Sequence, residues 1–346
     1  MKPEKTAAER SGRLLVVERA MKIAVLYGGV GPEREVSLAS GEAVLEACDR
    51  LGWEVLPVEI TPEGRFSVRG RALEPTEAIG RMKAEAVEAV FPALHGPVGE
   101  DGLIQGFLEV VGLPYAGSGV ESCALAMNKH ASRLIFTAAG MQVPPGRRVQ
   151  SKEELKELPL PAVVKPCRLG SSVGVKVVHG REDLEKAVSS VWEMGQECLV
   201  ERFIEGVEFS CPVWQRQGCV EPLPVIEIRP AGDRPFFDYE AKYSPQGAEE
   251  IVRLEYDPLL EELKELAARA HRQLGCRDFS RTDFVVHPAQ GPFVLELNTI
   301  PGMTRASLLP KALGAVGFSL ADLVRESIEQ AVSRTRSRCQ PARPTA

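Results

Sequence analysis

The stretch RTDFVVHPAQGPFVLELN, residues 281–298, decides the fold class of this chain. Two apolar runs flank the turn-forming residues HPAQG, a pattern that predicts a β-hairpin. If the hairpin turns around the dipeptide Ala289–Gln290, Asp283 lies directly opposite Glu296 on the neighbouring strand. Glu296 and Asn298 are two residues apart on one strand, so their side chains point to the same face. The hairpin therefore brings three oxygen-bearing side chains together.

Carboxylate and amide oxygens are ligands that Mg²⁺ prefers, so this set of three side chains suggests a magnesium site. The alternative is an edge hairpin whose acidic side chains are solvated. The apolar residues around Asp283, Glu296 and Asn298 indicate instead that the hairpin belongs to a core, where unpaired acids are costly. This environment favours the metal site.

The composition is that of an ordinary globular protein, and it excludes several classes of function. The 346 residues are enough for two or three domains, with 44% hydrophobic and 26% charged residues. A net charge of −6 gives no general attraction for nucleic acid. No apolar run reaches the roughly 20 residues that span a bilayer, and the N-terminus lacks a secretion-signal pattern. We therefore expect neither nucleic-acid binding nor membrane insertion.

The eight cysteines are scattered along the chain, without a CxxC pair or another spacing typical of zinc sites. Most of them lie beside apolar residues, which suggests that they act as small core side chains. Free thiols of this kind indicate a reducing compartment, and we expect the protein in the cytoplasm.

The chain divides into segments with different patterns. Residues 1–20 form a charged N-terminal extension, which is either dispensable or a short helix packed on the body. Over 21–118, strand-like runs alternate with a helix predicted at 37–52, which indicates a parallel sheet covered by helices. We expect a central unit over 119–205, a C-terminal unit over 206–333, and a basic, frayed tail over 334–346.

Two helices are predicted in the later units. LAMNKHASRLIFTAAG, residues 125–140, predicts one continuous helix closed by its glycine. The second helix begins at Asp257–Pro258, an N-cap followed by proline, and stops at Gly275. Its apolar residues recur at helical spacing, which predicts a buried stripe of Leu259, Leu263, Leu266, Ala270 and Leu274.

The central unit contains a candidate phosphate-binding loop. In KPCRLGSSVGV, residues 165–175, Lys165 precedes glycines and serines, including Ser171, whose N–H and hydroxyl groups could cradle phosphate oxygens. The alternative is an ordinary turn, but the lysine and the distant metal patch favour phosphate binding. For Lys129, in the predicted helix, a solvated side chain is the simpler interpretation.

A candidate nucleotide-base site follows the buried strand CLV. Glu201 and the backbone of Phe203 and Ile204 could recognise an adenine edge, and Glu208 could hold a ribose hydroxyl. The alternative for each acid is a plain surface position, because exposed acids are common.

Two N-terminal segments also carry candidate ligand-binding residues. In HGPVGEDG, His95 follows a strand at the edge where open α/β sheets bind ligands, and the glycines indicate close backbone approach. The alternative is a structural histidine. In GGVGPEREVS, Glu33 precedes a helix start, where it either compensates the helix dipole or binds an ammonium group in the crevice.

Five segments in this order resemble the D-alanine–D-alanine ligases of the ATP-grasp superfamily: VLYGGVGPEREVSLASG, ALHGPVGEDGLIQG, VVKPCRLGSSVGV, DYEAKY and RTDF…ELNTIPGMTRASLLPK. The resemblance extends from Met21 to about Ala331. It implies an α/β, three-domain ATP-grasp fold with an N-terminal Rossmann-like parallel-sheet domain. ATP is then expected between the central and C-terminal domains.

The resemblance implies roles for the candidate residues at the nucleotide site. Two Mg²⁺ or Mn²⁺ ions would be held by Asp283, Glu296 and Asn298, with Glu296 bridging the two ions. The implied nucleotide contacts are Lys129, Lys165 and the loop residue Lys242 at the phosphates, Glu201, Phe203, Ile204 and Phe236 at the adenine, and Glu208 at the ribose.

The implied reaction joins two D-alanines at the expense of ATP, through an acyl phosphate, and would serve peptidoglycan precursor synthesis in a bacterial cytoplasm. The implied substrate contacts are Glu33 and His95 at the first D-alanine, Arg281 and the Gly302 N–H at the oxyanion, and Ser307 and the Leu308 N–H at the second carboxylate. Glu33, Ser171 and Tyr243 would form a hydrogen-bonded set that closes a loop over the site.

Some positions depart from the family pattern or bear on specificity. Tyr243 favours D-alanine as second substrate, because family members that use D-lactate carry Phe there. Gly31, Asn128 and Leu169 replace the usual serine, aspartate and polar or acidic residues. Arg305 adds a positive charge beside the second-substrate pocket. These changes remove no residue assigned to chemistry.

Two other functions remain open at this point. One is a related ligase that makes D-Ala-D-Lac, D-Ala-D-Ser or another dipeptide, which Tyr243 and the intact EREVS segment disfavour. The other is a nucleotide-binding sensor or pseudoenzyme, but all metal ligands and Arg281 are present. The family resemblance also implies a homodimer.

Overall fold

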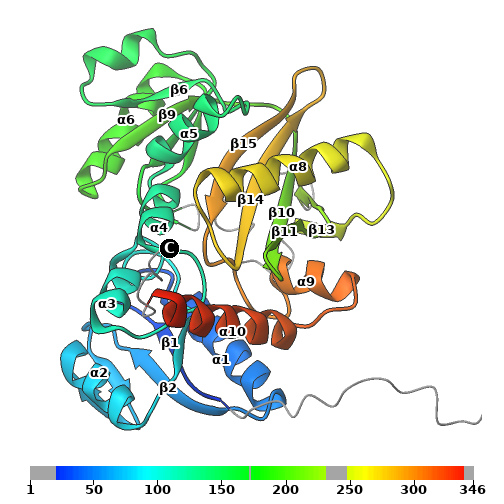
Figure 1. Cartoon of the computed structure of the whole chain (residues 1–346). Coiled ribbons are helices and arrows are strands. Elements are labelled where there is room, and N and C mark those ends of the chain that lie inside the picture. Colours follow the sequence, from blue (N-terminus) through cyan, green and yellow to red (C-terminus); the bar gives the residue numbers. More distant parts are fainter. Residues whose placement is uncertain (1–20, 171–172, 231–247, 339–346) are drawn as a thin grey trace, which may run out of the picture.

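The computed structural model describes residues 21–170, 173–230 and 248–338, which form three sheets with their covering helices (Figure 1). No helix in these ranges has the length and apolarity to cross a membrane. Among the described cysteines, all except Cys219 are buried and none is in a disulfide, as expected for core side chains.

The N-terminal sheet has the strand order β4-β3-β2-β1-β5. Its strands are β1 (Lys22–Gly28), β2 (Glu54–Ile60), β3 (Phe66–Val68), β4 (Arg71–Leu73) and β5 (Ala89–Pro92). The predicted parallel pairing holds for β1 with β2 and β5, whereas β3 and β4 add an antiparallel edge. Helices α1 (Arg34–Arg50), α2 (Pro75–Ala84) and α3 (Leu103–Val111) complete this part. Helix α1 begins at Arg34 rather than at the predicted residue 37.

The central sheet has the order β6-β9-β7-β8, and all its strands are antiparallel. The strands are β6 (Gly146–Val149), β7 (Ala162–Pro166), β8 (Lys176–Val178) and β9 (Cys198–Arg202). The helix α6 (Arg181–Glu193) packs against this sheet, and the short helix η2 (Glu153–Glu157) contacts α6. The loop between β7 and β8 is the predicted glycine- and serine-rich segment.

The C-terminal sheet has the order β13-β12-β10-β14-β15, and β11 pairs with β10. The strands are β10 (Val207–Arg216), β11 (Cys219–Pro222), β12 (Ile226–Pro230), β13 (Ala248–Val252), β14 (Phe279–His287) and β15 (Gly291–Asn298). Helix α8 (Pro258–Gln273) covers one face, with the Asp257 side chain accepting a hydrogen bond from Leu259 N as predicted for an N-cap. Leu263, Ala270 and Leu274 of its predicted stripe are buried, and Leu260 joins them.

The predicted helix over 125–140 is wrong as a single element, because the chain forms α4 (Val120–Met127) and α5 (Lys129–Ala138). Asn128 separates them with an extended backbone, and its side chain accepts hydrogen bonds from His130 N and Ala131 N. An asparagine that caps a new helix ends the previous one, and this local competition is not visible in the apolar periodicity. Helices α4 and α5 pack on β15 of the C-terminal sheet.

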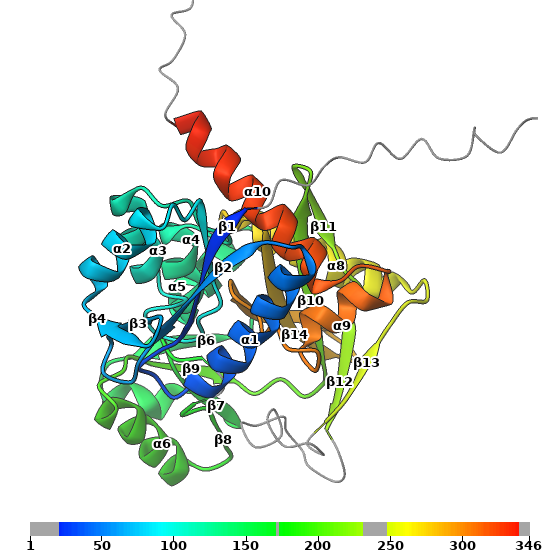
Figure 2. The same cartoon turned by 90° about the horizontal axis from the view of Figure 1, so that it is seen from below.

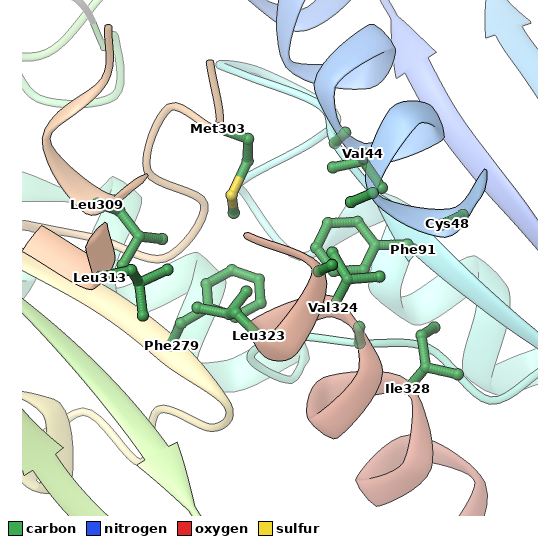
Figure 3. Close-up of a cluster of buried hydrophobic side chains, with 14 of the residues drawn as sticks. Val44, Cys48, Phe91, Phe279, Met303, Leu309, Leu313, Leu323, Val324 and Ile328 are labelled. Atoms are coloured by element: carbon green, nitrogen blue, oxygen red, sulfur yellow. The ribbon is translucent and has the colours of Figure 1, made fainter. Parts of the chain in front are cut away.

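The C-terminal helix packs on the N-terminal sheet and its helix α1. Helix α10 (Leu320–Arg338) lies beside α1 on the N-terminal sheet, and α9 (Leu308–Ala315) precedes it (Figure 2). A shared core is formed by Val44 of α1, Phe91 of β5, Phe279 of β14, Met303, and Val324 of α10 (Figure 3). The rings of Phe91 and Phe279 stack with centroids 5.9 Å apart. The expected frayed tail from 334 is wrong for its first residues, because α10 continues to Arg338.

Candidate active site

The hairpin of β14 and β15 pairs Asp283 with Glu296, as the sequence predicts. The predicted turn is wrong in detail, since His287 pairs with Gly291 and three residues form the turn. Gly291, the first residue after the turn, adopts φ +76°, a left-handed conformation that glycine favours. A β-bulge between Asp283 and Phe284 shifts the register by one residue and restores the pairing. The bulge therefore places Asp283 opposite Glu296.

Asp283 lies at the centre of a hydrogen-bonded group on the hairpin. Arg281 donates from Nε to Oδ1 at 2.8 Å and from Nη2 to Oδ2 at 2.7 Å. Asn298 Nδ2 donates to Oδ2 at 3.1 Å, and Ser210 Oγ on β10 donates to Oδ1 at 2.5 Å. Burial disfavours the charge on Arg281, but the neighbouring Asp283 outweighs it and raises the pKa of the guanidinium. Arg281 therefore stays charged and is held against Asp283 by two hydrogen bonds.

Lys129, the first residue of α5, contacts the carboxylate of Glu296. Its Nζ lies 3.1 Å from Glu296 Oε2 and donates to Leu169 O at 2.8 Å. The side chain is 11% exposed, so the simpler interpretation of a solvated lysine is wrong. Burial lowers the pKa of this ammonium, but the charge of Glu296 outweighs burial and the net shift is upward. The break of the helix at Asn128 places Lys129 at the start of α5, facing the hairpin.

The donor set of the hairpin fits Mg²⁺. Within the described ranges, no three or more His, Cys, Asp or Glu side chains form a metal-ligand cluster. Two carboxylates and the amide of Asn298 nevertheless suit a cation that takes one or two carboxylates and completes its shell with water and substrate phosphates. Arg281 pairs with Asp283 and Lys129 pairs with Glu296, so these two carboxylates lie beside positive charges.

Glu201 on β9 is a buried acid between two cations. Lys165 Nζ lies 2.7 Å from Oε2, and Arg133 Nε of α5 lies 3.3 Å from Oε1. The side chain is only 4% exposed, so this carboxylate is buried between its two cations. Each carboxylate oxygen can accept two hydrogen bonds, so Glu201 keeps capacity for a further donor, such as an amino group of a bound base.

The other predicted base and ribose contacts lie near the end of β9. The Phe203 N–H donates to Pro161 O at 3.0 Å, so this backbone group serves the fold. Ile204 is buried with Val285 and Phe293 in a small apolar cluster. Glu208 lies on β10 opposite Val285, beside the same cluster. Glu208 therefore lies beside an apolar cluster, and the roles of these residues at a nucleotide base and ribose stay predictions.

Glu33 lies where three segments converge. It precedes α1, but its side chain makes no capping hydrogen bond, which argues against a simple cap role. A Cβ on Gly96 would lie 2.1 Å from Glu33 Oε2, and a Cβ on Gly170 would lie 2.7 Å from Oε1. The glycines of the His95 segment and of the β7–β8 loop are therefore required for their close approach to this buried carboxylate.

His95 is buried between α1 and the segment that follows β15. Its Nε2 lies 2.8 Å from Ser40 Oγ on α1. Burial and the charge of Arg281 lower the pKa of the imidazole to about 4, so His95 is neutral near pH 7. The sequence predictions missed Ser40, because a serine on an amphipathic helix carries no functional pattern.

Glu100 is a second residue that the sequence predictions missed. This buried acid accepts hydrogen bonds from Gly96 N at 2.8 Å and from Ile300 N at 3.3 Å. Burial and the charge of Glu33 raise the pKa of its carboxyl group. Glu100 therefore joins the His95 segment to the segment after β15. The acidic residue within HGPVGEDG was the one sequence feature that could have indicated this role.

The second-substrate residues lie at the start of α9. A Cβ on Gly302 would lie 2.6 Å from Ser307 Oγ, so the two residues face each other. Ser307 Oγ lies 2.8 Å from Thr304 Oγ1 and does not cap the helix. Leu308 is the first residue of α9, where backbone N–H groups lack partners within the helix. Arg305 is largely exposed, with Glu46 of α1 at 3.9 Å.

The described residues thus bring the candidate site together from all three sheets. Asp283, Glu296, Asn298, Arg281 and Lys129 form one group, and Glu33, His95 and Gly170 lie on segments that approach one another. Ser171, Phe236, Lys242 and Tyr243 lie outside the described residues, and their predicted roles stay predictions.

Models of known families match most of the chain. The N-terminal part of the D-ala D-ala ligase family matches residues 22–81 and 71–118, and the C-terminal part matches residues 137–329. D-alanine–D-alanine ligases of Gluconobacter oxydans and Citrifermentans bemidjiense are 41% and 42% identical. The first alignment covers 91% of this chain and 100% of the relative, and the second covers 90% and 96%.

Solved structures agree with this similarity. D-alanine–D-alanine ligase of Bacillus anthracis complexed with ATP matches with a TM-score of 0.75 and 30% identity, over 92% of this chain and all of that chain. The VanG D-Ala:D-Ser ligase of Enterococcus faecalis matches with a TM-score of 0.75 and 28% identity, over 90% and 100% of the two chains. These matches confirm the expected α/β ATP-grasp fold, and with the family matches they show that the chain belongs to the D-alanine–D-alanine ligase family.

Proposed function

We propose that this protein joins two molecules of D-alanine to D-alanyl-D-alanine and converts ATP to ADP and phosphate. One observation carries the proposal. Two acids of the β14–β15 hairpin each pair with a cation, Asp283 with Arg281 and Glu296 with Lys129 of α5, and the chain belongs to this ligase family. The arrangement suits phosphoryl transfer, because it groups cations with candidate metal ligands, and both would neutralise phosphate charge. The product would enter peptidoglycan precursor synthesis in the cytoplasm, and we propose a homodimer.

The first step activates a carboxylate, which is a poor electrophile. The carboxylate oxygen of the first D-alanine attacks the γ-phosphorus of ATP, so that an acyl phosphate forms and ADP leaves. Lys129, Lys165 and Lys242 hold the phosphates in this proposal, and Glu33 binds the ammonium group of the first substrate near His95. Asp283, Glu296 and Asn298 would hold Mg²⁺ or Mn²⁺, which supplies positive charge to the phosphates.

The second step forms the amide bond. The amine of the second D-alanine attacks the acyl carbon and loses a proton, and inorganic phosphate leaves. Arg281 and the Gly302 N–H stabilise the negative oxygen of the tetrahedral intermediate, while Ser307 and the Leu308 N–H hold the second carboxylate. Glu33, Ser171 and Tyr243 close the site and exclude water, which would otherwise hydrolyse the acyl phosphate.

The nucleotide contacts support ATP as the phosphate donor. Glu201, Phe203, Ile204 and Phe236 would surround the adenine, with Glu208 at the ribose. The buried carboxylate of Glu201 supports this proposal, because its oxygens can accept a further hydrogen bond from the adenine amino group.

The function is tested by phosphate release from Mg·ATP with a panel of amino and hydroxy acids, with products identified by mass. We expect release that depends on D-alanine, yields the dipeptide and is absent with L-alanine. D-Serine or D-lactate as the preferred second substrate would keep the ligase chemistry but overturn the specificity. The similarity to a D-Ala:D-Ser ligase makes this arm necessary, since the fold alone does not separate the substrates. ATP binding with no release across the panel would favour a sensor.

Glu201→Gln is expected to raise the KM for ATP by about tenfold, with a small change in the KM for D-alanine. The amide removes the charge between Lys165 and Arg133 and replaces one acceptor oxygen with a donor. Steady-state kinetics at varied ATP measure the effect. Glu197→Gln is the matched control, because Glu197 pairs with Arg148 and Arg168 on the surface. Equal KM values for both variants would remove Glu201 from the adenine site.

Tyr243→Phe is expected to gain measurable incorporation of D-lactate as the second substrate at acidic pH. Loss of the hydroxyl would alter the closed loop that distinguishes an attacking amine from an attacking hydroxyl. Mass spectrometry of the product detects depsipeptide directly, with the unmodified enzyme as the control. No gain in D-lactate incorporation counts against the role of Tyr243.

A further inference from the structure

Two buried serines on α1 make different connections. Ser37 Oγ accepts from Gly28 N at 2.9 Å and donates to Ala93 O at 2.7 Å, so it joins the ends of β1 and β5. Ser40, one turn later, accepts from Met303 N at 3.2 Å and contacts His95 Nε2 at 2.8 Å. Both serines are 0% exposed. Only Ser40 reaches the segment after β15, which is 263 residues away in sequence.

The hydrogen-bond directions at Ser40 follow from its partners. The Met303 N–H can only donate, so Ser40 Oγ accepts this bond and its own proton is available to His95 Nε2. The imidazole also forms a hydrogen bond with the backbone of Ile300, and this bond raises the pKa of His95. A bond that raises the pKa is one that the ring donates, so the Ile300 backbone accepts a ring proton. The ring is then neutral, with its proton on Nδ1 directed at Ile300 and Nε2 directed at Ser40.

The segment from Ile300 to Met303 is held at further points. Glu100 accepts from Ile300 N, and the side chain of Met303 is buried in the shared core beside Val44 (Figure 3). Gly302 lies between these contacts, and in the proposed mechanism its N–H stabilises the oxyanion. Any rotation of the peptides on either side of Gly302 would misdirect this N–H.

We propose that Ser40 is a positioning residue, which locks the neutral tautomer of His95 and the Met303 peptide so that Gly302 points at the reacting carbonyl. The inference rests on the proposed ligase function. Ser40 itself touches no substrate, and its effect passes through His95 and the Ile300–Met303 segment.

Kinetics of Ser40→Ala and Ser37→Ala provide the test. We expect Ser40→Ala to lower kcat for dipeptide formation by roughly 10- to 100-fold and to leave the KM for ATP within about twofold. Ser37→Ala loses the same number of buried hydrogen bonds, so we expect a similar decrease in Tm but a kcat near that of the unmodified enzyme. Ser40→Cys repeats the test if Ser40→Ala does not fold, because the thiol fills the space and is a weak donor. Equal kcat values for the Ser40 and Ser37 variants would overturn the proposal.

A spectroscopic readout separates this proposal from the function itself. Imidazole ¹⁵N shifts in the unmodified protein, assigned with His95→Gln, are expected to show a proton on Nδ1 and none on Nε2 of His95. In Ser40→Ala the ring is expected to populate both neutral tautomers. A proton on Nε2 in the unmodified protein would overturn the proposal even if the enzyme is active. If D-alanine-dependent release is absent but the shifts are as expected, the proposed function fails while the Ser40 contact stands.

Discussion

Arg281→Met is expected to lower kcat by about 10³-fold, the largest effect among the single substitutions. The guanidinium is the proposed donor to the oxyanion, and loss of one such donor costs roughly 10²- to 10³-fold. The change also leaves Asp283 without its two charged hydrogen bonds, in a site where both side chains are largely buried. Phosphate release and dipeptide formation, followed together at saturating substrates, measure the loss.

Two further variants identify the cause of this loss. Arg281→Lys keeps the charge but loses the planar fork that contacts both Asp283 oxygens, so we expect an intermediate decrease of about 10²-fold. Arg216→Met is the matched control, since Arg216 lies at the end of β10 over the rings of Trp214 and Phe318 and pairs with Glu221. A folded Arg281→Met protein with more than about a tenth of the normal kcat would contradict the oxyanion role.

Arg334→Met is expected to lower the free energy of unfolding by about 3–5 kcal/mol, the largest expected effect on stability. Arg334 on α10 donates to both carboxylate oxygens of Asp278, at 2.6 and 2.9 Å. Asp278 is 0% exposed and also accepts from Gly117 N at 2.7 Å. Methionine leaves this carboxylate charged and unpaired in the interior. Urea unfolding followed by circular dichroism measures the shift of the midpoint.

The same chain offers controls for the Arg334 prediction. Arg336→Met removes an exposed positive charge from the same helix, and we expect little change in the unfolding midpoint. Asp278→Asn combined with Arg334→Met should recover part of the loss, because the neutral amide still accepts from Gly117 N. Asparagine also tolerates the left-handed backbone at this position, where φ is +60°. An Arg334→Met midpoint equal to that of Arg336→Met would show that the buried pair contributes no stability.

Local sequence patterns determined the elements that build the site. The hairpin over 281–298, the helix that begins at Asp257–Pro258, and the loop after Lys165 follow from periodicity, caps and turn residues. These signals act over a few residues, so they are visible without tertiary structure. The candidate ligands Glu296 and Asn298 follow from strand alternation, and Asp283 follows from the pairing of the two hairpin strands.

Sequence patterns gave the wrong element where two local signals compete at the same residues. Asn128 has helix-forming residues on both sides, and whether it ends one helix or continues it depends on its own capping hydrogen bonds. The turn of the hairpin and the bulge after Asp283 shift the register in opposite senses. The sequence indicated the correct pairing of Asp283 with Glu296, although the predicted turn was wrong.

By itself, the sequence determined the α/β class, the hairpin and its acids, because each depends on residues close together in the chain. Only the tertiary structure decided that α10 packs on α1, that Arg334 pairs with buried Asp278, and that Ser40 reaches Met303. Ser37 and Ser40 look alike in the sequence, because both are small polar residues on one helix. Their roles differ because long-range packing brings Met303 and His95 to one serine and the ends of β1 and β5 to the other.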